Sequence, residues 1–449
     1  MNAPDMQRVR MSLPYYKSFG WEPVVVCVDE KFVAGYRDDL LLETVPDDIE
    51  VHKVKAWPLE VTTKFGLGSL SLRSYYSFKK KGTELLQQKK FDLVFFSTSL
   101  FHVCALGRYW KEKFGVPFLV DMQDPWRTDF YLNKPATQRP PKFKIAYAIN
   151  KKMEAYTMPF ADGIISVSQS YIDTLKARYS QLKDTPALLL PFGNAEKDFR
   201  MVKEKNIGPQ IINRENGKIN VVYVGALNKF FFPLIEAFFH AFIEEATNKE
   251  LYHFYFIGSN YAVGSTDKMV EKLAERLNIK HLVTEIPDRI SYFSAISTLL
   301  KSDIIFISGS IDPQYNPSKV YNNLFTGKPI FAVLNSNNHV KKILDEANAG
   351  IVVGVSETDD LATMTDRIRL KIPEFEQLHC RETRTDFSDL KKYNAETMVR
   401  KQVGFFDQIL HNGFSQSNNT YRTFSASKAF AIGIHGVEQL FALLLLTQL

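Results

Sequence analysis

The fold of this chain is indicated most sharply by residues 316–329, which read NPSKVYNNLFTGKP. Asn316 is a preferred N-cap, the proline after it suits the first helical position, and Gly327 with the next proline stops a helix. The predicted helix separates two apolar runs, 304–308 and 329–333, that are typical of buried strands. A strand, a helix and a second strand in this order predict a parallel sheet covered by helices.

Short apolar runs alternate with amphipathic stretches over most of the chain, and no internal repeat is visible. The runs with strand character are 24–28, 93–96, 118–120, 163–167 and 187–190, then 220–225, 254–258, 303–308, 329–333 and 350–353. The turn 191–194 and the polar stretch 201–218 interrupt this alternation. We therefore predict an α/β protein with two doubly wound, Rossmann-like domains, residues 1–200 and 201–394, that face a cleft.

The two ends of the chain depart from this pattern. Residues 6–19 predict a helix stopped by Gly20, so the run 24–28 would be the second strand of its domain. We expect the central first strand to be missing and a version extended upstream to be more stable. Residues 395–412 predict a C-terminal helix, and the tail 413–449 has no assigned structure. Its last 21 residues are apolar but contain His435 and Glu438, which disfavours a membrane anchor.

Composition limits the classes of function. The 449 residues carry 56 Lys and Arg against 50 Asp and Glu, a formal charge of +6, which suits anionic small ligands and gives no argument for nucleic acid. Three widely spaced cysteines exclude a disulfide framework and a zinc ribbon, and they suggest reduced, cytosolic thiols. No metal or Walker motif is present, so we expect no metal and no cofactor.

The helix start at residues 316–319 predicts an anion site. Its free backbone N–H groups, the Ser318 hydroxyl and the Lys319 ammonium would converge at the carboxyl edge of the second sheet, an arrangement suited to a diphosphate. A well-capped helix with a solvated lysine explains the same residues equally well.

Several motifs together resemble the family four glycosyltransferases, which have the GT-B fold and include enzymes of polysaccharide and glycolipid assembly. The matching segments follow the family order and are 121–126, 191–199, 223–225 with Lys229, 317–321 and 327–329.

The resemblance implies transfer of a sugar from a nucleotide-diphosphate sugar to a glycan or lipid-linked acceptor, with retention. It implies donor contacts in the second domain from the residues Gly225, Lys229, Arg289, Ser318, Lys319 and Asn322. Among these, Arg289 would lie near the base and ribose, and an ordinary surface turn is the alternative for this residue. The chain departs from the family at Ala226, where an Arg is frequent, and at Asn322, where a Glu is frequent. These departures keep a second hypothesis open, a non-catalytic relative that serves as a binding or partner subunit. A third is a nucleotide-sugar epimerase.

Four residues of the first domain are candidates for the acceptor side. Asp121 and Asp124 follow a predicted strand, so we expect catalytic roles as a base or in binding acceptor hydroxyls. Trp126 is predicted to stack on a sugar, and His102 to bind the acceptor. A turn at Asp124 and a structural histidine are the plainer alternatives.

The segment 64–90 mixes aromatic and basic side chains. It suits either peripheral contact with an anionic membrane or a helix that covers the sheet. We expect a cytoplasmic protein, with possible contact at the inner face of the membrane.

Overall fold

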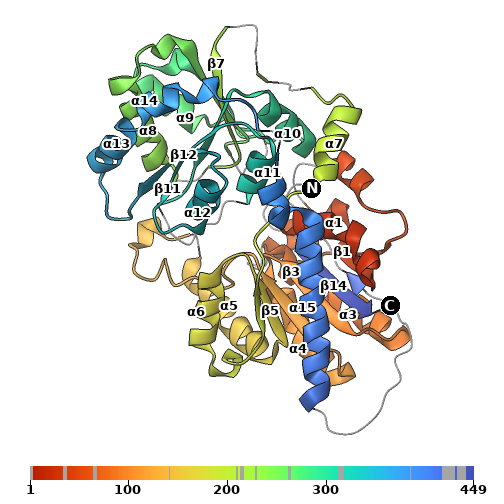
Figure 1. The fold of residues 1–449 in the computed structure, drawn as a ribbon. Helices are drawn as coiled ribbons and strands as arrows, with labels where there is room; N and C mark the ends of the chain where they lie inside the picture. The colour runs from red at the N-terminus through yellow and green to blue at the C-terminus, as the bar shows by residue number, and fades with distance from the viewer. Residues whose placement is uncertain are drawn as a thin grey trace. The chain divides into compact units, whose positions relative to one another are not determined.

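The structure, a computed structural model, describes residues 4–33, 38–63, 68–140, 142–208, 211–212, 217–227, 230–260, 264–311, 318–384, 386–416, 430–431 and 441–448. The chain forms two compact units (Figure 1). Unit 1 comprises residues 1–192 and 395–449, and unit 2 comprises residues 193–394.

Unit 1 is built on one sheet, whose strand order is β2-β1-β14-β3-β4-β5-β6. The strands are β1 (Trp21–Val28), β2 (Glu50–Val54), β3 (Leu93–Thr98), β4 (Phe118–Met122), β5 (Gly163–Ser166), β6 (Ala187–Leu189) and β14 (Phe441–Gln448), and the short β13 (Phe430–Ala431) pairs with β14. All pairings are parallel except those made by β13 and β14.

The position between β1 and β3 is where the sequence predicts a missing central strand. In the structure β14 fills it, antiparallel to both neighbours, with Val24 opposite Leu445 and Phe96 opposite Leu443. The first described element, α1 (Pro4–Tyr16), is a helix, in agreement with the sequence pattern. A segment distant in sequence thus completes the hydrogen bonding of β1 and β3 on this side.

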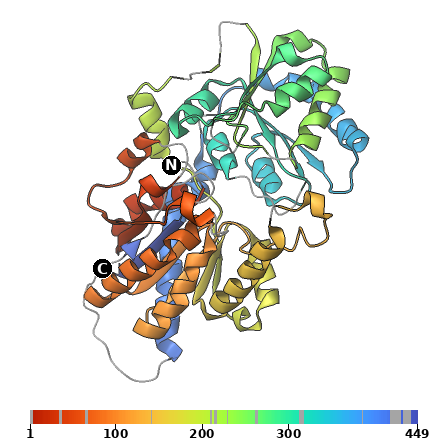
Figure 2. The ribbon, with the colours of Figure 1, turned by 180° about the vertical axis from the view of Figure 1, so that it is seen from behind.

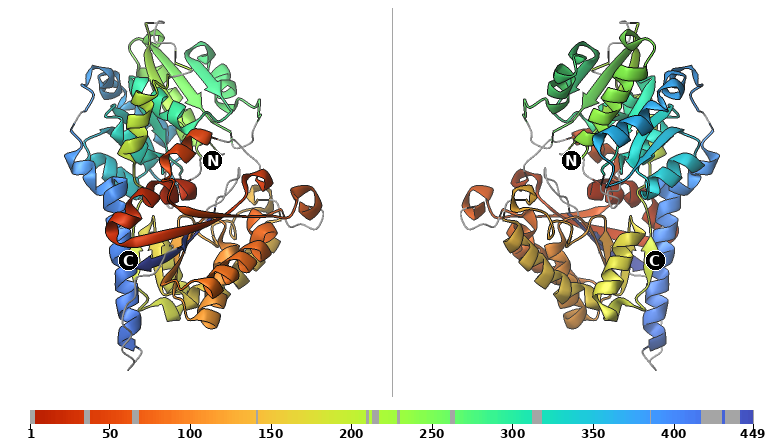
Figure 3. Two further views of the ribbon diagram at one scale, coloured as in Figure 1. Left: turned by 90° about the vertical axis from the view of Figure 1, so that its right-hand side faces the viewer. Right: turned by 90° about the vertical axis from the view of Figure 1, so that its left-hand side faces the viewer.

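Helices cover both faces of the unit 1 sheet (Figures 2 and 3). Besides α1 they are α2 (Leu59–Thr62), α3 (Leu70–Gln88), α4 (Ala105–Phe114), α5 (Phe143–Thr157), α6 (Gln169–Arg178) and α15 (Ala395–Gln416). Neighbouring residues of a strand point to opposite faces, so Val25 packs in one core with α1 and α15 while Val24 packs in the other with α3, α4 and α6. This two-sided burial explains why the strands read as continuous apolar runs.

Unit 2 has a six-stranded, wholly parallel sheet with the order β12-β11-β10-β7-β8-β9. Its strands are β7 (Ile219–Val224), β8 (Tyr252–Ile257), β9 (Val283–Ile286), β10 (Ile304–Ser308), β11 (Ile330–Asn335) and β12 (Gly350–Val355). Its helices are α7 (Glu196–Glu204), α8 (Phe232–Glu245), α9 (Met269–Arg276), α10 (Tyr292–Lys301), α11 (Lys319–Phe325), α12 (His339–Glu346), α13 (Leu361–Arg369) and α14 (Ile372–Glu376). The strands β8 and β9 follow β7 on one side, whereas β10, β11 and β12 follow on its other side, so the order of strands reverses beside β7. Doubly wound sheets bind ligands at such a point.

The units divide the chain differently from the predicted domains. Unit 1 ends at Phe192 rather than at residue 200, because α7 packs on α10 of unit 2 and Ser297 Oγ donates to the Ile207 carbonyl at 2.6 Å. The predicted C-terminal helix is α15, which packs on α1 and belongs to unit 1. Within the described residues, no helix is both long enough and apolar enough to cross a bilayer.

Candidate functional site

The predicted donor residues of unit 2 gather at the carboxyl edge of its sheet. Gly225 follows β7, Gly258 follows β8, Arg289 follows β9, and α11 begins with Lys319 after β10. The two glycines have φ values of 138° and 68°, which other residues rarely adopt, so both loops can bend sharply at the strand ends. The Gly258 turn also lies close to the backbone of Arg289, since a Cβ on this glycine would be 3.8 Å from Arg289 Cα.

The closest approach in this group is between Gly225 and Lys319. A Cβ atom placed on Gly225 would clash with the Lys319 ammonium and lie 2.7 Å from Lys319 Cε. Only a residue without a side chain therefore leaves the lysine in its place. The backbone conformation at the end of β7 favours glycine, and any side chain there would in addition force the end of the Lys319 side chain to move.

Tyr223 holds both partners of this contact. Lys319 Nζ donates a 2.8 Å hydrogen bond to the Tyr223 hydroxyl and lies 4.3 Å from the centre of its ring. The same hydroxyl donates to the carbonyl oxygen of Ala226 at 3.2 Å. The phenol, 1% exposed, thus connects the first turn of α11 with the loop that follows β7.

The electrostatic environment favours an anion. Removal from water and the nearby Arg289 cation lower the pKa of Lys319 to about 7. Within the part of the chain that the structure describes, no carboxylate lies within ion-pair distance of the partly buried Lys319. An anion that binds beside these two neighbouring cations is attracted by both of them and relieves their mutual repulsion.

Asn322, one turn after Lys319, is held by protein partners. Its Oδ1 accepts hydrogen bonds from Asn194 Nδ2 at 2.8 Å and from the Tyr292 hydroxyl at 3.3 Å. Its Nδ2 lies 3.1 Å from the same hydroxyl. Asn194 also donates its backbone N–H to the Tyr393 carbonyl at 2.9 Å, so α11 is connected to both ends of unit 2.

Of the two other predicted donor residues, Ser318 and Lys229, the structure describes only Ser318. Ser318 precedes α11 in helical conformation, and its side chain makes no capping hydrogen bond. Lys229, and the predicted cap residues Asn316 and Pro317, lie outside the described residues. Of the predicted donor residues, the structure therefore describes Gly225, Arg289, Ser318, Lys319 and Asn322.

In unit 1, Asp121 is the centre of a buried polar network at the end of β4. Its Oδ2 lies 2.9 Å from Arg8 Nε and accepts from Ser97 Oγ at 2.9 Å and Gln123 Nε2 at 2.7 Å. Burial raises the pKa of Asp121, and the Arg8 cation acts in the opposite direction. Arg8 also donates to the Leu190 carbonyl at 2.7 Å, just before the chain leaves unit 1. Asp121 is 0% exposed, so the structure places it in a network that supports the edge.

The remaining acceptor candidates differ in accessibility. Asp124 is exposed. Trp126 is 4% exposed and stacks on Phe101, with ring centres 5.5 Å apart, so this ring face is covered by the protein. His102 Nδ1 lies 2.6 Å from Ser71 Oγ, and burial lowers the pKa of His102 to about 4, which keeps the imidazole neutral at pH 7.

Sequence reasoning did not assign roles to Arg8, Tyr223 or Asn194, which hold the predicted residues in place. Tyr223 had one local signal, its position directly before Val224 and Gly225 in a motif of the resemblance. Asn194 had the same kind of signal, because it lies in the segment 191–199 of the resemblance, whereas Arg8 had none, because its partners are distant in sequence.

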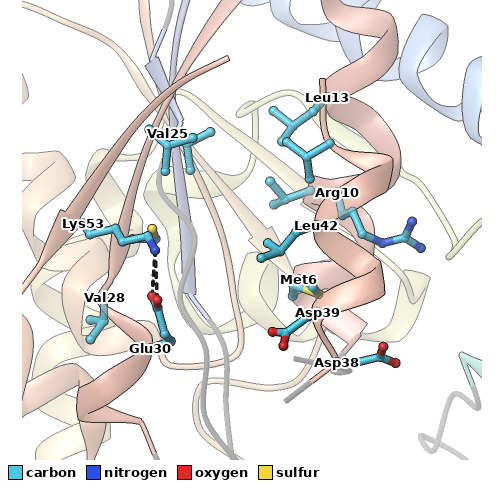
Figure 4. Close-up of a pocket in the computed structure, with 14 residues that line it drawn as sticks. Met6, Arg10, Leu13, Val25, Val28, Glu30, Asp38, Asp39, Leu42 and Lys53 are labelled. Carbon is cyan, nitrogen blue, oxygen red and sulfur yellow. Dashed lines mark hydrogen bonds and ion pairs between the residues drawn. The ribbon is translucent and has the colours of Figure 1, made fainter. Parts of the chain in front are cut away.

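A separate cavity of about 190 Å³ opens in unit 1 (Figure 4). Its lining is mostly apolar and comes from α1, β1, β2 and the segment Asp39–Thr44, with a Lys53–Glu30 hydrogen bond of 3.0 Å at one side. Figure 4 shows Arg10 directed away from it. The described residues contain no cluster of three His, Cys, Asp or Glu side chains able to hold a metal ion.

The comparisons with known proteins found similar structures but no similar sequences among protein families or curated proteins. No protein-family model and no curated protein match this sequence. Among solved structures, HepE from Anabaena in complex with UDP and glucose aligns with a TM-score of 0.54, 12% identity, and coverage of 93% of this chain and 96% of that chain. The N-terminal domain of Candida albicans trehalose-6-phosphate phosphatase aligns with a TM-score of 0.53 and 12% identity, and the alignment covers 82% of this chain and 84% of that chain. The α,α-trehalose 6-phosphate synthase of Burkholderia multivorans aligns with a TM-score of 0.50 and 12% identity, and the alignment covers 80% of each chain. Two Rossmann-like units and these likenesses show that the chain has the GT-B fold.

Proposed function

We propose that this protein is a glycosyltransferase that moves a sugar, with retention, from a nucleotide-diphosphate donor to a glycan or lipid-linked acceptor. The observation that carries the proposal is the pair of cations Lys319 and Arg289 at the carboxyl edge of unit 2, with Gly225 leaving room for the lysine. The HepE structure, which has the same fold, was solved with UDP and glucose, a combination that supports a nucleotide ligand here.

The two cations suit the chemistry of the leaving group. The bond between the sugar C1 and the diphosphate oxygen breaks, and a bond forms between C1 and an acceptor hydroxyl oxygen. Negative charge develops on the departing diphosphate, and Lys319 and Arg289 stabilise it more as the bond lengthens. Because the lysine has a pKa of about 7, an approaching diphosphate also favours its charged form.

On the acceptor side, Asp124 is the group we assign to chemistry, because this exposed residue follows β4 and desolvation raises the pKa of its carboxyl group to about 6, closer to neutral pH. It would take the proton of the acceptor hydroxyl or orient that hydroxyl. We assign Asp121, Trp126 and His102 to supporting this edge, in view of their burial or internal partners.

A non-catalytic relative is the second candidate, and Asn322 favours it. The amide of this residue, at the position where the family often has a ribose-binding Glu, is already bonded to Asn194 and Tyr292. Such a protein would bind the nucleotide without transferring a sugar.

Calorimetry and turnover separate these proposals. Nucleoside diphosphates should bind the wild type, and Lys319→Ala should weaken them by about tenfold or more while leaving nucleosides nearly unchanged. Lys272→Ala is the matched control, since this lysine is 70% exposed and paired with Asp267. Slow donor hydrolysis would support the transferase, whereas binding without turnover across donors and acceptors would support the partner role. Equal loss for nucleosides and diphosphates would contradict the phosphate contact.

A further inference from the structure

The segment 130–160, which contains α5, combines exposed positive charge with exposed apolar side chains. The stretch 130–160 contains six basic residues, Lys134, Arg139, Lys142, Lys144, Lys151 and Lys152, and one acidic residue, Glu154. Glu154 is 0% exposed and pairs with Arg178 at 3.1 Å, so it adds no charge to the surface. The exposed charge of this stretch is therefore wholly positive.

Four large apolar side chains lie among these lysines. Ile145 is 64% exposed, Tyr156 43%, Phe160 38% and Ile149 37%. The residues Ile145, Ile149, Lys152 and Tyr156 are spaced by four, three and four positions, which places them on one face of α5. Most soluble helices turn such a stripe toward a core, whereas α5 buries Glu154 and Thr157 and exposes the stripe.

The two exposed aromatic rings, Tyr156 and Phe160, contact a cation of the neighbouring helix. The guanidinium of Arg108, on α4, lies 3.6 Å from the centre of the Phe160 ring and 4.4 Å from that of Tyr156. Arg108 also pairs with Glu112 at 2.7 Å. In the described part of the chain, Lys142, Lys144, Lys151 and Lys152 have no carboxylate within ion-pair distance, so these four cations remain available to an outside anion.

We propose that this α5 surface, defined as Lys142, Lys144, Ile145, Ile149, Lys151, Lys152, Tyr156 and Phe160, docks on an anionic lipid bilayer. Aliphatic and aromatic groups would enter the headgroup region, with the lysines contacting anionic headgroups around them. Charge complementarity selects an anionic partner, and the two exposed isoleucines select a bilayer over a soluble polyanion, which offers no apolar layer.

The segment 64–90, which sequence reasoning considered for this contact, is less suitable. Its helix α3 buries Phe78 and Leu85, and the exposed large apolar side chain that α3 offers among its described residues is Tyr76. The docking surface is thereby assigned to α5 rather than to α3.

Vesicle sedimentation tests the assignment with the full chain. The wild type should bind vesicles of phosphatidylcholine that contain one third phosphatidylglycerol. Its binding to vesicles of pure phosphatidylcholine should be weaker by at least about tenfold. Ile145→Gln/Ile149→Gln and Lys151→Gln/Lys152→Gln should each reduce binding to the anionic vesicles by about tenfold. Leu361→Gln/Leu370→Gln is the matched control, because these leucines are 38% and 74% exposed on or next to α13 of unit 2.

Failure of the wild type to bind, or equal loss in the control, would overturn the proposal. Loss on lysine replacement but not on isoleucine replacement would indicate a polyanion site and also overturn it. Loss with Tyr76→Ser but not with the α5 variants would move the contact to α3. All substituted side chains are exposed, and equal melting temperatures confirm that the variants fold. The assay contains no donor or acceptor, so its failure and that of the proposed glycosyl transfer are distinguishable.

Discussion

Binding of a nucleoside diphosphate should depend on pH through Lys319. In the free protein the pKa of this lysine is about 7, so half of the molecules carry the ammonium at pH 7. A bound diphosphate stabilises the charged form and raises the pKa, so binding above pH 7 takes up a proton. The affinity contributed by Lys319 therefore falls as the pH rises, by about tenfold per unit once the free lysine is mostly neutral.

Between pH 7 and pH 9 the charged fraction falls from about one half to about one hundredth, so the dissociation constant should rise by roughly fiftyfold. The second ionisation of a phosphate, near pH 6, is complete in this range and adds little. Isothermal titration calorimetry at several pH values measures the slope. Repeating it in buffers of different ionisation enthalpy measures proton uptake directly.

Two variants make this prediction specific. Lys319→Gln should bind more weakly at pH 7 and show a nearly flat pH profile, because the titrating group is gone. Arg289→Gln should move the decline to higher pH, since Arg289 is one cause of the lowered lysine pKa. An unchanged slope in Lys319→Gln, or a flat profile in the wild type, would refute the reasoning.

Three further outcomes follow from the geometry. Gly225→Ala should displace the lysine and raise the dissociation constant of nucleoside diphosphates by about tenfold or more in calorimetry, with nucleosides little affected. Asp124→Asn should lower turnover in a transfer assay while donor affinity stays constant, and a parallel loss of donor affinity would show that the residue is not on the acceptor side. Arg8→Met should leave the buried Asp121 carboxylate without its cation and destabilise the protein by about 3–5 kcal/mol, or roughly 10 °C in melting temperature. The double variant Arg8→Met/Asp121→Asn should recover part of that loss, and no recovery would argue against the ion pair.

Most of the strands that sequence reasoning located are buried on both faces, because continuous apolar runs are visible without knowledge of the partner. The edge strands β6 and β12 were also located, although they are less buried, because they are apolar in sequence. Sequence reasoning missed β2 and β9, which read EVHKV and VTEI. Both lie at an edge of their sheet and alternate buried with less buried positions, so their apolar content is too low to stand out. The role of β14 was missed for another reason, since periodicity says nothing about which gap in a sheet a strand enters.

The candidate site was predictable in part. Glycine at a strand end and lysine at a helix start have local signatures, and both lie among the predicted donor residues of unit 2. Their mutual contact and the hydrogen bond to Tyr223 depend on the order of strands in the sheet. The burial of Asp121 by Arg8 likewise depends on how α1 packs, which no short motif records.

The clash between a Cβ on Gly225 and the Lys319 side chain has a consequence for evolution. The two positions are expected to vary together, because any larger residue at 225 takes the space that the end of a long side chain at 319 occupies. Among natural relatives of this chain, we therefore expect covariation: lysine at 319 accompanied by glycine at 225, and a residue other than glycine at 225 accompanied by a shorter side chain at 319. A set of homologues in which alanine or serine at 225 coexists freely with lysine at 319 would show that the loop after β7 adjusts more readily than the contact described here implies.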